Sequence, residues 1–180
     1  DARVSDRFAL LTGGSRAALP SQQALRTTIE WSHDLLKPEE RALFRRLSAF
    51  AGRFTLDDVG SVCAFDDVPP ATVLDVLSSL VDKSLVLVDF AHAEPRYKML
   101  ESTLEYALQK LGERDENTYR HRHADYLSRL FEKADQAWPT TPTKAWLETY
   151  EPELENLRAA LEWSFGPNGD ATLGVTLFAF

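Results

Sequence analysis

The sequence predicts a mainly α-helical protein that carries one small β-hairpin. Apolar residues recur at helical spacing along most of the 180 residues. Residues 84–90 and 96–100 instead form two short runs with alternating or β-branched side chains, separated by a polar turn that holds His92 and Glu94. Such alternation is typical of two strands half-buried against helices. One helix is expected to end before the first strand, and another to begin at Glu101.

Helix, hairpin and helix follow one another across residues 75–106, which is the layout of a winged-helix domain. Before this stretch the sequence predicts a helix with Ser21 as its cap, in which Leu25, Ile29 and Trp31 lie on or beside the apolar face. A second helix begins at Pro38 and is expected to place Arg46 on a solvated face with two other arginines. A short strand at 54–56, a short helix at 56–63 and a helix at 71–82 complete the domain.

The helix at residues 71–82 occupies the position of the recognition helix in DNA-reading winged helices. Such a helix needs arginine, lysine, asparagine or glutamine side chains directed at base edges. Here most positions are apolar, the polar ones include Asp75 and Asp82, and no base occurs before Lys83. Arg96 and Lys98 on the wing are too few to reverse this. We therefore predict a winged helix used for protein packing.

After the hairpin, the sequence predicts helices that end near Gly112 and that span residues 116–137, 143–150 and 153–165, with a further helix beginning after Asp170. Amphipathic helices joined by short turns suggest the start of an α-helical repeat array. His121 and His123 are two residues apart on one helix, so they point to different faces and make a poor metal pair. No metal site is expected.

Bulk composition limits the classes of function. The chain has 28 acidic and 20 basic residues and a net charge of −8, which opposes non-specific binding to nucleic acid or to an anionic membrane. The single Cys63 fits a reducing compartment, and no apolar run approaches the roughly 20 residues of a membrane span. We expect a cytoplasmic protein. Both ends suggest a fragment, because the chain stops within an apolar run at residues 173–180.

Several segments resemble bacterial transcriptional regulators that contain a signal-transduction ATPase core of the STAND or NB-ARC type, known as AfsR-like or LuxR-like regulators. The segments are RFALLTGGSRAALPSQQALRTTIEWSHDLL (7–36), ERALFRRLSAFAGRFTLDDVGSVC (40–63), VLDVLSSLVDKSLVLV (73–88), RYKMLESTLEYALQKL (96–111) and ELENLRAALEWS (153–164). The resemblance implies three parts: the end of the ARC-type helical subdomain at 1–36, the winged helix at 37–112, and the start of a tetratricopeptide-like (TPR-like) region at 113–180.

The same resemblance implies that ATP or ADP binds the parent protein, through motifs that this segment lacks. Relatives place a Met-His-Asp motif at the end of the second wing strand, where its histidine contacts the ADP phosphate. The matching residues here are Met99, Leu100 and Glu101, and leucine has no donor for a phosphate. We therefore expect no cofactor in this segment, and these three residues are its only candidate nucleotide-sensing position.

The leading hypothesis is a non-catalytic regulatory segment that couples an upstream ATPase domain to downstream helical repeats of the same chain by protein packing. The residues expected at such interdomain contacts are Trp31, Leu74, Leu77, Val81, Arg96 and Lys98. The alternative is a DNA-binding winged-helix transcription factor that uses Arg96 and Lys98. A hydrolase built on His33 and Asp34 is disfavoured, because adjacent helical residues diverge and no paired nucleophile is apparent.

Overall fold

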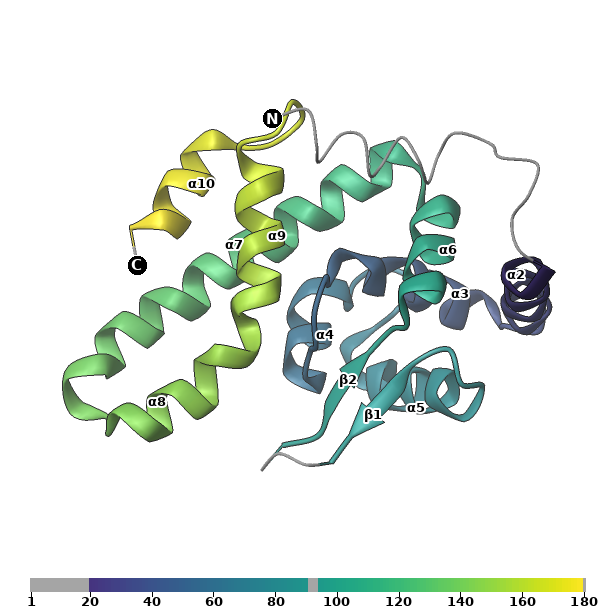
Figure 1. Ribbon diagram of the computed structural model, residues 1–180, viewed down its shortest axis with the longest axis horizontal. Coiled ribbons are helices and arrows are strands. Elements are labelled where there is room, and N and C mark those ends of the chain that lie inside the picture. The colour runs from purple at the N-terminus through teal and green to yellow at the C-terminus, as the bar shows by residue number, and fades with distance from the viewer. Residues whose placement is uncertain (1–19, 91–93, 180) are drawn as a thin grey trace.

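The computed structural model describes residues 20–90 and 94–179, and it confirms a mainly helical fold with a two-stranded antiparallel hairpin (Figure 1). Predictions for residues 1–19 and for the turn at His92 lie outside the described residues. The helices and strands are α2 (Pro20–Asp34), α3 (Pro38–Arg46), α4 (Leu56–Cys63), α5 (Val73–Asp82), β1 (Leu87–Asp89), β2 (Arg96–Lys98), α6 (Glu101–Leu111), α7 (Glu113–Ala137), α8 (Thr143–Tyr150), α9 (Leu154–Ser164) and α10 (Ala171–Phe178). Short 3-10 turns follow α3 (η1, Leu47–Ala49), precede α5 (η2, Pro70–Thr72) and flank α8 (η3, Trp138–Thr140; η4, Glu151–Glu153).

The wing, formed by β1 and β2, is shorter than the sequence predicts. Val88 pairs with Tyr97 at its centre, whereas residues 84–86 close the end of α5. Ser84 has a φ of 58°, and the amides of Leu85 and Val86 donate to the carbonyl of Leu80 at 3.0 and 3.3 Å. Because these amides are used in the turn, the strand begins only at Leu87.

The strand predicted at residues 54–56 is present as a single bridge to the wing. Phe54 and Tyr97 exchange two backbone hydrogen bonds, of 2.9 and 2.8 Å. The rings of Phe50, Phe54 and Tyr97 also stack, with centroids 4.8 and 6.2 Å apart. The segment between α3 and α4 is therefore fixed to β2, which lies between it and β1.

Helices α3, α4 and α5 pack around one hydrophobic core beneath the wing. Its fully buried side chains are Leu43, Phe44, Leu47, Phe54, Val59, Val62, Val68, Leu77, Leu80 and Val86. The short helix α4 begins at a capping box, in which the hydroxyl of Thr55 accepts from the amide of Asp58 and the carboxylate of Asp58 accepts from the amide of Thr55. This cap satisfies amides that a short helix otherwise leaves unpaired.

Arg46 is buried, and the prediction of a solvated face for it is wrong. Its guanidinium donates to Tyr119 Oη at 3.0 Å, to the carbonyls of Cys63 and Phe65 at 2.9 and 2.8 Å, and to the carboxylate of Asp67. It also lies 4.2 Å from the ring centroid of Phe65. These contacts hold the loop between α4 and α5 against α3, because one guanidinium on α3 donates to the carbonyls of Cys63 and Phe65 at the start of the loop.

Replacement of Arg46 by methionine is expected to destabilise the protein by about 3 kcal/mol, since it leaves the buried carbonyl of Cys63 without its donor and removes the other hydrogen bonds of the guanidinium. Arg45→Met is the matched control, because Arg45 is half-buried next to it in the same helix. Urea unfolding followed by circular dichroism measures both. Equal stability of the two variants would contradict a structural role for Arg46.

A second polar cluster joins α3 to the C-terminal end of α5. Buried Glu40 accepts from the amide of Lys37 at 2.8 Å, from Ser79 Oγ at 2.6 Å and from Lys83 Nζ at 2.7 Å. Burial opposes ionisation of Glu40, but these hydrogen bonds outweigh it and lower its pKa from 4.5 to about 2. The carboxylate thus fixes the angle between the two helices.

The lowered pKa of Glu40 predicts a dependence of stability on pH. Its folded-state pKa lies below the unfolded value, so its contribution is present above about pH 4.5 and is lost as the pH falls towards 2. The full contribution is about 3 kcal/mol. Glu40→Gln should make the unfolding free energy less dependent on pH between about 4.5 and 2 than it is in the unaltered protein. Glu39→Gln should leave this pH dependence unchanged. Urea unfolding at several pH values measures both.

Helices α7 to α10 form a second, smaller core. Its buried side chains are Ala124, Leu127, Phe131, Ala134, Ala160 and Leu177. Helix α7 runs from α6 to α8 and contacts α4 and η1 of the winged helix as well as α9 and α10 (Figure 1). None of the described helices is both long and apolar enough to cross a membrane.

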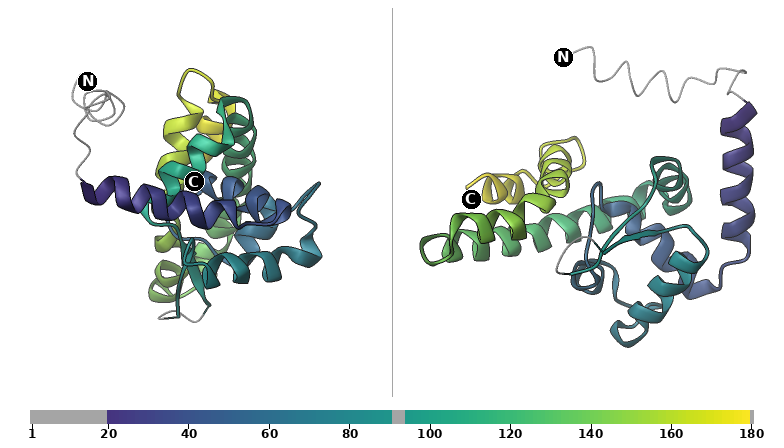
Figure 2. Two further views of the ribbon diagram at one scale, coloured as in Figure 1. Left: turned by 90° about the vertical axis from the view of Figure 1, so that its right-hand side faces the viewer. Right: turned by 60° about the horizontal axis from the view of Figure 1, so that its bottom comes forward.

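Helix α2 lies at the edge of the molecule, as both views in Figure 2 show. Ile29, His33 and Leu36 are buried against the body, whereas Leu25 and Trp31 are 45% and 67% exposed. The predicted apolar face is therefore rotated, and His33 takes the inner position. Its ring packs between Phe44 and Tyr106, at centroid distances of 5.7 and 5.4 Å, as an aromatic core residue.

Candidate functional site

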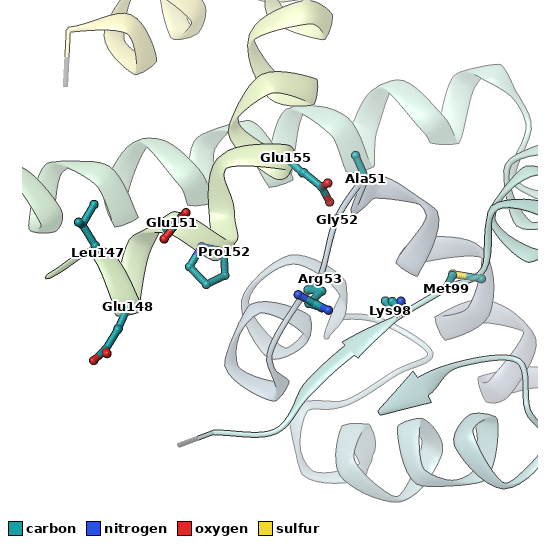
Figure 3. A pocket seen from close by; sticks show the side chains of 10 residues that line it. All are labelled: Ala51, Gly52, Arg53, Lys98, Met99, Leu147, Glu148, Glu151, Pro152 and Glu155. Carbon is teal, nitrogen blue, oxygen red and sulfur yellow. The ribbon is translucent and has the colours of Figure 1, made fainter. Parts of the chain in front are cut away.

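The candidate site is the junction between the winged helix and the helices that follow it. One side is formed by residues 51–53 and β2, and the other by α8, η4 and the start of α9 (Figure 3). The two sides meet through buried polar side chains that come from distant parts of the sequence. We call this set of contacts, centred on Arg96, Glu153 and Asn156, the junction.

A buried ion pair lies at the centre of the junction. Arg96 Nη1 donates to Glu153 Oε1 at 2.6 Å, and the two residues are 8% and 4% exposed. Burial and the nearby carboxylate of Asp58 raise the pKa of Glu153, while hydrogen bonds from Arg96 and Asn156 act in the opposite direction. The raised pKa means that the charge on Glu153 is costly and depends on Arg96.

Asn156 completes the junction with hydrogen bonds to the backbone. Its side chain is fully buried; Nδ2 donates to the carbonyl of Arg53 at 2.6 Å and to Glu153 Oε2 at 3.0 Å, and Oδ1 accepts from the amide of Gly52 at 3.0 Å. A Cβ at Gly52 would lie 2.9 Å from Cβ of Glu155. Position 52 is therefore glycine because α9 passes too close for a side chain.

Helix α7 adds further contacts between the two parts. Tyr126 Oη donates to the carboxylate of Asp58, and Arg122 Nε donates to the carbonyl of Val62 at 3.0 Å. His123 lies against Phe50 with ring centroids 4.9 Å apart, and burial lowers its pKa to about 3. His123 is thus a neutral packing residue at physiological pH.

Arg96→Met is expected to destabilise the chain by about 3 kcal/mol, because it leaves Glu153 buried without a cationic partner. The loss should be smallest at acidic pH and grow as the pH rises through the raised pKa of Glu153, since the protonated carboxyl needs no cation. Urea unfolding at several pH values measures this.

Two matched variants test the assignment. Lys98→Met changes an exposed base two residues along the same strand and should have little effect. Arg96→Met combined with Glu153→Gln removes both charges and should recover part of the loss. A double variant no more stable than Arg96→Met would argue against an uncompensated charge as the cause.

A groove of about 670 Å³ lies on the solvent side of the junction. We call it the junction groove. Figure 3 shows its lining: Ala51, Gly52, Arg53, Lys98, Met99, Leu147, Glu148, Glu151, Pro152 and Glu155. Its bases come from the winged helix and its acids from α8, η4 and α9. Among the described residues no group of histidine, cysteine, aspartate and glutamate is arranged to hold a metal ion.

Comparison with known proteins identifies the domain at residues 36–112. A family model described as a winged helix-turn-helix domain matches residues 36–112. This part of the chain is a winged helix-turn-helix domain. The predicted layout of helices around the wing is therefore confirmed.

The relatives extend over nearly the whole chain. It is 43% identical over 178 residues, or 97% of its length, to proteins of Mycobacterium tuberculosis and Mycobacterium bovis named "Putative HTH-type transcriptional regulator". It is 41% identical over 116 residues, 64% of its length and 30% of the relative, to an uncharacterized protein of M. tuberculosis. The chain spans 20% of the length of the named regulators. No solved structure matches it significantly. The domain and the relatives support a transcription-regulator family.

The winged helix-turn-helix domain presents an unusual recognition helix. The outward side chains of α5 and the turn before it are Ala71, Thr72, Leu74, Asp75, Ser78 and Asp82, all exposed. Lys83, the first base after α5, is held by Glu40 and Ser79. Arg96 on the wing is buried in its ion pair with Glu153. The surface that reads bases in DNA-binding proteins of this fold thus offers carboxylates and hydroxyls but no cationic or amide side chain.

The three residues of the predicted nucleotide-sensing position, Met99, Leu100 and Glu101, lie in different environments. Met99 lines the junction groove, whereas Leu100 is 47% exposed and Glu101 is exposed at the first turn of α6. A leucine and a carboxylate offer no donor to a phosphate. The three residues do not fit a nucleotide phosphate.

The predicted interdomain residues also fall into different environments. Trp31 and Leu74 are 67% and 52% exposed, and Val81 is half-buried. Leu77 is fully buried in the core of the winged helix-turn-helix domain, so it cannot offer a contact surface while the domain is folded. Arg96 is buried against η4, and Lys98 is exposed in the groove.

Sequence reasoning missed the partners of Arg96. The sequence places Glu153 and Asn156 only in an amphipathic helix at residues 153–165. The spacing of three between Glu153 and Asn156 places them on one side of a helical turn, which was the available signal. Nothing local indicates that Arg96, 57 residues upstream of Glu153, would face them.

Proposed function

We propose that this chain is a non-catalytic regulatory segment of a transcriptional regulator, in which the winged helix-turn-helix domain packs against protein rather than reading DNA. The observation that carries this proposal is the acidic and apolar outer face of α5, with Lys83 after it and Arg96 on the wing already engaged in ion pairs. The junction supports it further, because buried polar contacts tie the domain to the following helices. A change in the position of one part is then passed to the other.

The proposed setting is a parent protein of the STAND or NB-ARC type. An ATPase domain upstream would bind ATP or ADP, and TPR-like helical repeats downstream would sense a signal. This rests on the segment resemblance and on the length of the relatives, of which the chain spans 20%. The names of the relatives support a regulatory rather than an enzymatic role. Because Leu100 and Glu101 do not fit a phosphate, no nucleotide contact is assigned to this domain.

The three predicted divisions, 1–36, 37–112 and 113–180, remain part of this proposal. Helix α7, the first helix of the third part, contacts both the winged helix-turn-helix domain and α9. In this setting the exposed Trp31 on α2 and Leu74 on α5 are the surface residues available to an upstream domain.

The alternative function is DNA binding. The family match and the printed names of the relatives favour it. It requires that the chain present enough bases to neutralise phosphates, since affinity for duplex DNA comes largely from such contacts. Of the two wing bases considered for this role, only Lys98 is exposed.

Fluorescence anisotropy with labelled duplex DNA at low salt separates the two functions. Non-specific binders have dissociation constants of about 10⁻⁴–10⁻⁶ M even at physiological salt, and we expect the chain to bind more weakly than this range. A variant with Asp75→Lys, Ser78→Arg and Asp82→Lys restores bases to the outer face of α5 and should gain salt-dependent binding. Tight binding by the unaltered chain that weakens steeply with salt would overturn the packing proposal.

A further inference from the structure

The junction groove has walls of opposite charge. The winged helix-turn-helix domain contributes Arg53 and Lys98, whereas α8, η4 and α9 contribute Glu148, Glu151 and Glu155. The lining also includes the apolar residues Ala51, Met99, Leu147 and Pro152 (Figure 3). The exposed surface of the groove is more polar than apolar, which suits a ligand held mainly by charged contacts.

The charged groups of the groove are largely free to meet a ligand. Lys98 makes no ion pair with any residue in the described part of the chain. Arg53 pairs with Asp89 at 3.5 Å but leaves 42% of its side chain exposed. Glu151 and Glu155 are exposed, whereas Glu148 lies 3.8 Å from Lys144 on the outer surface of α8.

We propose that the junction groove binds a short peptide with free termini, whose carboxylate meets Lys98 and Arg53 and whose amino group meets Glu151 and Glu155. This inference rests on the proposed regulatory function and names a ligand for it. A zwitterion places each terminus opposite a wall of the other sign. The apolar residues of the lining suit a peptide with aliphatic side chains.

Size and charge select this class of ligand. A volume of about 670 Å³ lies within the range of small-molecule sites and is sufficient for a few residues of peptide. Two bases against three acids leave the groove with an excess of negative charge. A nucleotide would bring its phosphates next to carboxylates, so polyanions are disfavoured.

Binding in the groove would act directly on the junction. On one wall, the amide of Gly52 donates to the side chain of Asn156, and the carbonyl of Arg53 accepts from it. On the other wall, Glu155 lies close to Gly52. A ligand held by both walls favours the arrangement in which the two parts are docked. The signal would therefore reach the winged helix-turn-helix domain without any contact with its core.

The test is isothermal titration calorimetry of the 180-residue chain with trileucine. The free peptide should bind at least about tenfold more tightly than N-acetylated or C-amidated trileucine, since each modification removes one charged contact. Lys98→Met should weaken binding of the free peptide but not of the C-amide. Glu151→Gln with Glu155→Gln should weaken binding of the free peptide but not of the N-acetyl form.

Lys133→Met is the control, because Lys133 is an exposed lysine of α7 outside the groove, and it should leave binding unchanged. Equal affinity for free and blocked peptides, no detectable binding, or tighter binding of ADP than of peptide would each overturn the inference. These results leave the proposed function standing. DNA binding with a steep salt dependence would instead overturn the proposed function, whatever the peptide does.

Discussion

The ion pair between Arg96 and Glu153 is the constraint on which the arrangement of the molecule depends. Each charge is buried only because the other is present, so the wing and the start of α9 cannot separate without hydrating both. Asn156 extends the pair to the backbone at Gly52 and Arg53. The position of the helical region is therefore set by directional contacts in addition to the packing of α7 against Phe50.

Two separate hydrophobic cores joined by a polar junction suit a regulatory segment. The two hydrophobic cores, one under the wing and one between α7, α9 and α10, keep each part folded. The polar contacts between the two parts specify one relative orientation. When the parts separate, water can replace the lost hydrogen bonds, whereas exposing an apolar interface to water costs much more free energy. A transcriptional regulator of this design would change state by opening the junction while its two parts remain intact.

Local pattern predicted the fold well, whereas the junction depended on distant contacts. Helical periodicity and the alternation around Val88 and Tyr97 located nearly every element, because burial of one face follows from the local sequence. Arg46 was misplaced because its partners, from Cys63 to Tyr119, come from other elements. The same reason hid Glu153 and Asn156. Charge patterns show which helical face is polar, but not which polar side chain finds a buried partner.

The same contacts separate the fold of this domain from the function usually associated with it. A winged helix-turn-helix reads DNA through bases on its recognition helix and wing, and a fold alone supplies neither. Here Lys83 forms an ion pair with Glu40 within the domain, and Arg96 forms one with Glu153 outside it. Releasing Arg96 for a phosphate would leave Glu153 buried and unpaired. DNA binding through Arg96 would therefore compete directly with the junction, because one guanidinium cannot pair with Glu153 and with a phosphate at the same time.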